Sequence, residues 1–204
     1  MAWCTLPRIL GRGRRSFFNK DRLYVALYAR ETGECWRRVE ERYHWAIIVG
    51  PKYEVGEKSH GTRYSAREIM TAPIHNPRQE VPWWEYEEQK IRMGPTLGIM
   101  VRVLVGKVRR RDRLVSIIRG VPMRPETQDW SCLSWVEEVL DALREDGTVL
   151  GAPAPPWIRI RDTAVQFAQE KEAARRFDSP PGDWGFDRTK VPTFDVLQMR
   201  ASVE

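Results

Sequence analysis

Cysteine and histidine are both scarce in this chain of 204 residues, which contains three of each. Three scattered cysteines cannot form a disulfide framework, so we expect a protein of a reducing, cytoplasmic compartment. The chain has no CxxC or HxxxH spacing, and its sequence therefore gives no support to a zinc site or to another metal site. No apolar run approaches the ~20 residues of a membrane-spanning helix, so we expect no membrane association.

Several motifs that carry chemistry in other proteins are missing as well. The chain lacks a Gly-rich phosphate-binding loop, an internal repeat and the GxSxG sequence of serine hydrolases. The sequence thus predicts neither a bound cofactor nor a serine hydrolase site.

The composition is that of a folded protein, with 42% hydrophobic residues and nine Trp. Much of the net charge of +6 lies at the start of the chain, because residues 1–20 contain five basic residues and no acidic one. We therefore predict a flexible basic arm over 1–20, a single catalytic domain over 21–178 and a C-terminal tail over 179–204.

The pattern of elements predicts an α+β fold, with a mainly antiparallel sheet of about five strands packed against helices. The segment YHWAIIVG is rich in β-branched and aromatic residues and stops at Gly50-Pro51, as a strand does. We expect strands at 22–29, 43–50, 62–69, 83–91 and 97–108, and helices at 111–120, 128–147 and 157–177. The second helix has the clearest amphipathic pattern, with Asp129 or Ser131 as its cap and Gly147 at its end.

Cys132 lies in the first turn of this second helix. Unpaired N–H groups and the positive end of the helix dipole lower the pKa of a thiol at such a position, which makes Cys132 a candidate nucleophile. His44, at the start of an apolar strand, is the candidate general base. The alternatives are a buried, inert cysteine and a half-buried imidazole with a structural role.

The order of these residues resembles a known class of thiol enzymes. A strand of the form HWAIIVG, followed much later by a cysteine that begins a helix, resembles the lecithin retinol acyltransferase-like branch of the permuted papain-like enzymes. The resemblance implies a permuted papain-like architecture and a further polar residue, usually His, on the next strand. Here that position is occupied by Ser65 or is displaced to His60.

A second resemblance covers most of the chain, through RLYVALYAR, YHWAIIVGPK, WWEYEEQKI, VRVLVGKV, RGVPMRPE, WSCLSWVEEVL and RDTAVQF. These segments are similar to a family of small fungal proteins that we associate with the arginine-containing cyclodipeptide synthases. The resemblance implies condensation of arginine with a second amino acid into a diketopiperazine. The implied partners are arginyl-tRNA and a second aminoacyl-tRNA.

Such a reaction needs a pocket for a guanidinium and a surface for tRNA. Trp83, Glu85 and Glu87 share one face of an expected strand and offer an aromatic ring and two carboxylates, although acids on a strand often only face solvent. The tRNA backbone would meet the basic arm and a cluster within KVRRRDR. The cluster consists of Arg109, Arg110, Arg111 and Arg113, and its alternative is a solvated helix start.

The mechanism expected from these residues is covalent. His44 deprotonates Cys132, which takes the arginyl group as a thioester, and the second amino acid then attacks it. Two other functions remain open. One is a tRNA-independent cysteine acyltransferase or hydrolase, and the other is a non-catalytic protein-binding module with Cys132 in its core.

Overall fold

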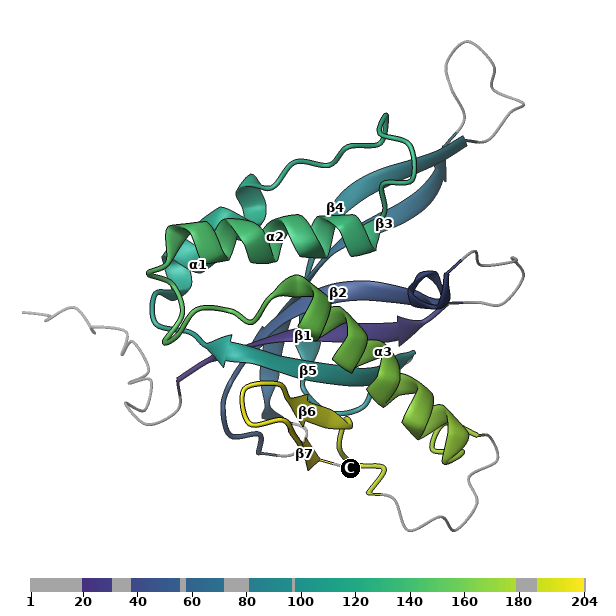
Figure 1. The fold of residues 1–204 in the computed structure, drawn as a ribbon, viewed down its shortest axis with the longest axis vertical. Helices are drawn as coiled ribbons and strands as arrows, with labels where there is room; N and C mark the ends of the chain where they lie inside the picture. Colours follow the sequence, from purple (N-terminus) through teal and green to yellow (C-terminus); the bar gives the residue numbers. More distant parts are fainter. Residues whose placement is uncertain are drawn as a thin grey trace, which may run out of the picture.

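One mixed sheet of seven strands forms the centre of the molecule, in the order β4-β3-β2-β1-β5-β6-β7 (Figure 1). The structure is a computed structural model and describes residues 20–30, 38–55, 58–71, 81–96, 98–178 and 187–203. The strands are β1 (Arg22–Ala29), β2 (Tyr43–Gly50), β3 (His60–Thr71), β4 (Val81–Arg92), β5 (Ile99–Lys107), β6 (Thr193–Asp195) and β7 (Arg200–Val203). The helices are α1 (Arg111–Gly120), α2 (Cys132–Asp146) and α3 (Trp157–Ala173), with a 3-10 turn, η1, at Val39–Arg42.

The central strand β1 is apolar on both faces because both faces are covered. It pairs antiparallel with β2 on one side and with β5 on the other, and its six central residues are all buried. This agrees with the expectation for RLYVALYA, since a strand inside a covered sheet has no solvent side on which to place polar residues.

The helices cover one face of this sheet (Figure 1). Helix α2 packs on β2 and β3, and α3 packs on β1 and β5. We call the side of the sheet that the helices cover the helix face. Fully buried Trp45 and Trp135 lie in the core between this face and the helices. The opposite side, which we call the second face, has a smaller core of Tyr24, Ala26, Tyr28, Ala46, Ile48 and Met93. In the described part of the chain, no helix is long and apolar enough to span a membrane.

Helix α2 begins and ends where its sequence signals indicate. Ser131 is the N-cap and forms a capping box with Ser134, whose hydroxyl accepts a hydrogen bond from the Ser131 N–H at 3.3 Å. At the other end Gly147 has a φ of 65°, a left-handed conformation that glycine adopts without steric cost.

The sheet is larger than expected and is not wholly antiparallel. Two short strands, β6 and β7, come from the region expected to be a tail, and β6 pairs with β5 in parallel. Their three and four residues carry too little apolar pattern to indicate strands, so pairing with β5 decides their structure. The expected arm lies outside the described residues except for Lys20.

Strands β2 and β3 pair over only a short length. Their register runs from Ile47 to Val49 on β2 and from Thr62 to Tyr64 on β3, although β2 begins at Tyr43 and β3 continues to Thr71. Figure 1 shows the two strands diverging toward the end at which β2 begins. Residues 43–46 of β2 therefore do not pair with β3. We call this unpaired end of the two strands the opening, and the candidate site lies beside it.

Candidate functional site

Cys132 is the first residue of α2, and its sulfur lies at the opening between β2 and β3. The Arg30 guanidinium donates a hydrogen bond to Sγ, with Nη2 at 3.2 Å, and the Trp45 backbone N–H donates a second at 3.4 Å. Because β3 has already diverged from β2 at this point, the Trp45 N–H is available to a group other than the neighbouring strand. A sulfur at a helix N-terminus with two such donors can be stabilised as an anion.

The thiol is nonetheless buried, with only 1% of the residue exposed. Burial raises the pKa of the Cys132 thiol, while the Arg30 charge and the Trp45 N–H lower it by a smaller amount. Cys132 is therefore a neutral thiol at neutral pH, with the groups that favour its ionised form already in contact with the sulfur.

His44 does not contact Cys132. Side chains alternate along β2, so Tyr43 and Trp45 enter the helix-face core with Cys132, whereas His44 lies on the second face. The imidazole packs beside Tyr28, its partner on β1, with ring centroids 6.2 Å apart. The expected contact between thiol and imidazole is therefore wrong, because neighbouring residues on a strand place their side chains on opposite faces of the sheet.

A set of polar side chains surrounds His44 on the second face. We call it the polar cluster, and it consists of Tyr28, His44, Arg63, Ser65 and Glu87. Arg63 donates to Glu87 with Nη2 2.5 Å from Oε2, and the Ser65 hydroxyl donates to the same oxygen at 3.4 Å. The Arg63 guanidinium also lies over the Tyr28 ring, with Cζ 5.2 Å from the centroid. Ser65 is completely buried, so this cluster is part of the folded structure rather than a solvated surface.

Two buried polar atoms of the cluster have no hydrogen-bond partner within the described part of the chain. They are the Tyr28 hydroxyl and the Arg63 Nε. Buried donors of this kind are rare in folded proteins and are normally satisfied by a water molecule or a bound group. Burial raises the pKa of the Tyr28 hydroxyl, and its interaction with the Arg63 guanidinium lowers that pKa by a smaller amount. These two atoms therefore lie at the contact between Tyr28 and Arg63, beside His44.

Arg30 connects the two sides of the opening. Burial, together with the positive charges of Arg30 and Arg63, lowers the pKa of His44 to about 4 against the opposing effect of Glu87. Arg30 thus acts on the imidazole of His44 as well as on the thiol of Cys132, and one of its nitrogens is 3.9 Å from Glu68. His44 is consequently neutral at pH 7.

The remaining candidate catalytic residue, His60, lies away from this site. It is exposed at the start of β3, where Nδ1 is 2.9 Å from the Lys58 carbonyl oxygen, and it pairs with Arg92 rather than with a residue near the opening. The structure therefore brings Ser65 and His44 to one face, places Cys132 across the opening and leaves His60 outside.

The expected arginine pocket is partly occupied by the protein itself. Trp83, Glu85 and Glu87 share the second face, while Trp84 and Tyr86 pack against tryptophans on the helix face, so the expected alternation is confirmed. Glu87, however, already binds the Arg63 guanidinium. Glu85 is exposed and Trp83 is 47% exposed, which leaves these two side chains accessible to a ligand.

The basic cluster expected to bind nucleic acid lies at the other end of β1 from Arg30. Lys107, beside the cluster, pairs with Arg22, whereas Arg30 follows the last residue of β1. Two of the four arginines in the basic cluster form ion pairs, Arg111 with Asp21 and Arg113 with Asp146. Arg110 contacts Thr148 at 3.4 Å. No ion pair of Arg109 is found within the described residues. This cluster is thus less cationic than its sequence indicates.

The sequence did not indicate the roles of Arg30, Tyr28 or Arg63. Arg63 and Ser65 alternate with Tyr64 and Ala66, and that period-two pattern could have placed the first pair on a common face. No comparable signal exists for Arg30, because its contact with Cys132 joins residues 102 positions apart.

These features define an α+β protein with a polar site at an opening between two sheet strands. The chain belongs to DUF6914, a family of unknown function whose model matches residues 20–203. No curated protein and no solved structure matches the chain. Within the described residues, no group of three or more His, Cys, Asp or Glu side chains is placed to hold a metal ion.

Proposed function

We propose that the protein is an aminoacyl transferase that condenses arginine and a second amino acid, both from aminoacyl-tRNAs, into a cyclic dipeptide. One observation carries the proposal: the Arg30 guanidinium and the Trp45 N–H converge on Cys132 Sγ at the N-terminus of α2. Transfer of an activated acyl group needs a nucleophile and hydrogen-bond donors for the oxyanion that forms on the carbonyl. Cys132 is the candidate nucleophile, and the two donors beside its sulfur support the proposal.

The reaction begins on the arginyl ester. The Cys132 sulfur attacks the ester carbonyl, the bond to the terminal ribose breaks, and the thiol proton leaves with the ribose oxygen as a hydroxyl group. The amine of the second aminoacyl-tRNA then attacks the thioester, which forms the peptide bond and returns the thiol. Finally, the arginine amine attacks the remaining ester, closes the six-membered ring and releases the second tRNA.

Arg30 replaces His44 as the partner of the sulfur in this mechanism. Its positive charge favours the thiolate, whereas His44 lies on the second face beside two unsatisfied buried atoms. His44 is neutral at pH 7 and lies on the other sheet face from the sulfur, so it takes no part in these transfer steps.

The proposal keeps one feature of the permuted papain-like architecture, a candidate nucleophile at the start of a helix that packs on the sheet. It does not keep the direct thiol and imidazole pair of those enzymes. Since the Cys132 residue is only 1% exposed, an ester can reach the sulfur only if binding displaces part of its cover.

Recognition of arginine falls to Glu85 and Trp83 in this proposal. Glu87 on the same face already binds one guanidinium, that of Arg63, at 2.5 Å. Glu85 and Trp83 offer a carboxylate and an aromatic ring that are accessible, a combination that suits a planar cation. The product would form in the cytoplasm, where both aminoacyl-tRNAs are available.

The test is an incubation of the purified protein with arginyl-tRNA and a mixture of other aminoacyl-tRNAs, followed by mass spectrometry for arginine-containing cyclic dipeptides. We expect the product with the wild type and its loss, by several orders of magnitude in rate, in Cys132→Ala. His60→Gln is the matched control and should retain activity. Product formation that is unchanged in Cys132→Ala contradicts the covalent route, and no product with the wild type contradicts the function.

A second candidate is favoured by the burial and the raised pKa of Cys132. A thiol in this environment can be a core side chain, and the protein would then be a non-catalytic binding module with Trp83 on its interaction surface. An inert thiol at pH 7 together with no product supports this module. A reactive thiol without tRNA dependence supports the tRNA-independent acyltransferase or hydrolase instead.

A further inference from the structure

A separate cavity of about 680 Å³ lies on the second face, beside the short strand β6 and the edge strand β7. Its walls come from the segment 52–54 after β2, the segment 92–95 around the end of β4 and the C-terminal segment 188–190. Tyr24 of β1 and Arg102 of β5 also line it. None of these residues belongs to the polar cluster around His44.

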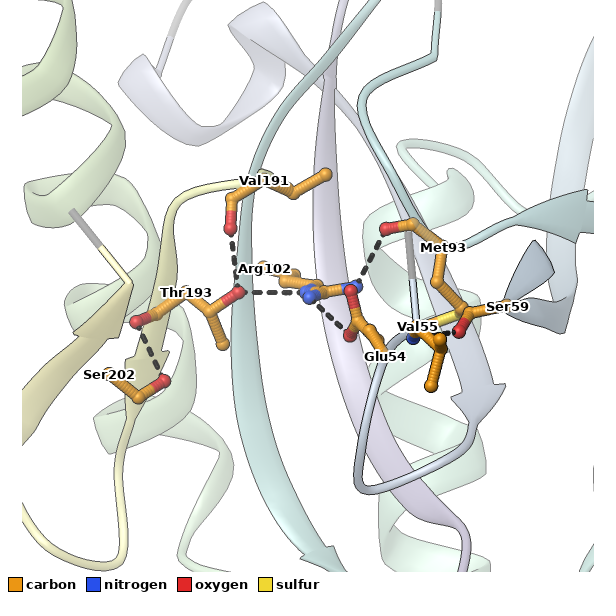
Figure 2. Close-up of polar contacts among 8 residues, drawn as sticks. All are labelled: Glu54, Val55, Ser59, Met93, Arg102, Val191, Thr193 and Ser202. Carbon is orange, nitrogen blue, oxygen red and sulfur yellow. Dashed lines mark hydrogen bonds and ion pairs between the residues drawn. The ribbon is translucent and has the colours of Figure 1, made fainter. Parts of the chain in front are cut away.

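Arg102 is a charged side chain in the apolar part of β5, whose other charged residue, Lys107, is at the exposed end of the strand. Arg102 is only 3% exposed. Figure 2 shows its guanidinium held on three sides. Nε donates to the Thr193 hydroxyl at 2.8 Å, Nη1 to the Met93 carbonyl at 3.2 Å and Nη2 to the Glu54 carboxylate at 2.5 Å. It also lies over the Tyr24 ring, with Cζ 4.9 Å from the centroid.

The partners of Arg102 are themselves fixed. The Thr193 hydroxyl donates to the Val191 carbonyl at 2.9 Å, and the Ser202 hydroxyl donates to the Thr193 carbonyl at 3.1 Å (Figure 2). On the other side, the Ser59 hydroxyl accepts a hydrogen bond from the Val55 N–H at 2.5 Å and holds the loop that carries Glu54. A buried charge costs free energy unless it is paired, so this construction maintains a cation in a fixed position beneath the cavity.

The rim adds further positive charge. Lys52, Arg92, Arg188 and Lys190 are all exposed at the cavity, and Glu54 is the one acid among its lining residues. Lys190 is paired with Asp187 at 3.0 Å. Within the described part of the chain, Arg92 and Arg188 have no acidic partner. The cavity thus combines one buried arginine with two rim arginines whose charge is not neutralised.

We propose that this cavity binds the phosphate of a nucleotide-sized ligand. Arginine forks suit phosphate because they donate two parallel hydrogen bonds to its oxygens. The volume lies within the range of small-molecule sites and is larger than a free phosphate needs. Tyr53, with 56% of the residue exposed at the cavity, adds an aromatic ring to its wall. The Lys52 ammonium lies over this ring, 4.3 Å from its centroid, so a base would stack on the opposite side of the ring.

The position of the cavity connects it to the candidate site. Tyr24 in the cavity and Tyr28 in the polar cluster lie on the same strand and the same face, four residues apart. At the rise of a strand this separation is about 13 Å. A nucleotide bound in the cavity therefore lies on the same sheet face as the polar cluster, with buried Ala26 between the two tyrosines. Identification of the ligand as the 3′ end of an aminoacyl-tRNA rests on the proposed function.

The test measures binding directly, by calorimetry at low and moderate salt, with AMP, the trinucleotide CCA and inorganic phosphate as separate probes. Arg92→Gln and Arg188→Gln remove rim charges and leave Arg102 and its buried partners intact. We expect each to weaken AMP binding by about tenfold, since each removes a charge-assisted hydrogen bond. Glu54→Gln should tighten binding, because it removes the negative charge and retains an acceptor for Arg102.

Arg159→Gln is the matched control, because Arg159 is exposed on α3, away from the cavity. It should bind AMP as the wild type does. Absence of saturable AMP and CCA binding overturns the inference, as does an equal loss in Arg159→Gln, which would indicate diffuse electrostatic attraction. Inorganic phosphate that binds as tightly as AMP also overturns it, because the ring would then contribute nothing.

The outcomes for this cavity and for the proposed function are distinguishable. Nucleotide binding without formation of a cyclic dipeptide supports the cavity and contradicts the proposed function alone. Formation of a cyclic dipeptide by a protein that binds neither AMP nor CCA contradicts the cavity alone.

Discussion

The guanidinium of Arg30 and the thiol of Cys132 are 102 residues apart in the chain and 3.2 Å apart in the structure. The contact lies beside the part of β2 that does not pair with β3, where the Trp45 N–H also reaches the sulfur. It places a permanent positive charge beside the sulfur, which partly offsets the rise in the thiol pKa that burial causes.

We expect Arg30→Gln to raise the pKa of the Cys132 thiol, because the substitution removes the charge that lowers it. The rate of alkylation by iodoacetamide, measured against pH, should therefore shift to higher pH and fall at neutral pH. The other cysteines are replaced by serine in both proteins, so that the signal comes from Cys132 alone.

His44→Gln provides the comparison for this experiment. Since His44 lies on the other face of β2, its replacement should move the alkylation profile far less than Arg30→Gln does. A larger shift in His44→Gln than in Arg30→Gln would show that the imidazole, rather than the guanidinium, controls the thiol.

The low pKa of His44 predicts a loss of stability in mild acid. In the unfolded chain the imidazole takes up a proton near pH 6.5, whereas in the folded protein it does so only near pH 4. Between these values the unfolded state binds more protons, so the free energy of unfolding falls as the pH is lowered from about 6.5 to about 4. The difference between the two pKa values corresponds to about 3 kcal/mol.

Urea denaturation at a series of pH values measures this effect. His44→Gln should lose this contribution to the slope between pH 6.5 and pH 4, whereas His60→Gln, which removes an exposed imidazole, should retain it. An unchanged slope in His44→Gln would place the acid sensitivity elsewhere in the molecule.

Glu87 should affect the titration of the same imidazole. Its negative charge raises the pKa of His44 against the effects of burial, Arg30 and Arg63. Glu87→Gln should consequently move the midpoint of the His44 ring resonances, followed by NMR, to a lower pH. Glu145→Gln on α2, an exposed residue, is the control and should leave the midpoint in place.

Gly61 should not tolerate a side chain. A Cβ at this position would lie 2.8 Å from the Val49 carbonyl oxygen and 2.5 Å from the Met93 sulfur, within the pairing of β2 and β3. We expect Gly61→Ala to lower the free energy of unfolding by about 1–3 kcal/mol, the usual cost of overpacking. Gly120→Ala has no atom within 4 Å of the new Cβ and should be neutral or slightly stabilising in the same urea experiment.

The local elements follow closely from local sequence. Strands β1 and β2 have the limits expected from their apolar runs, and α2 ends at Gly147 as expected. These limits depend on side chains a few residues apart, namely β-branched runs, capping groups and a glycine with positive φ. The sequence also places Cys132 in the first turn of a helix, as the structure does.

The short strands β6 and β7 and the site as a whole depend on pairings that no local pattern specifies. Thr193–Asp195 becomes a strand because it can pair with β5. His44 and Cys132 do not meet because alternation along β2 places His44 on the second face, whereas Cys132 lies on the helix face. The composition and periodicity of the sequence by themselves determined an α+β protein with a thiol at the start of a helix. Only the tertiary structure decided that Arg30 contacts the thiol and that Arg102 lies buried beneath a basic cavity, because both arrangements arise from contacts between segments far apart in the chain.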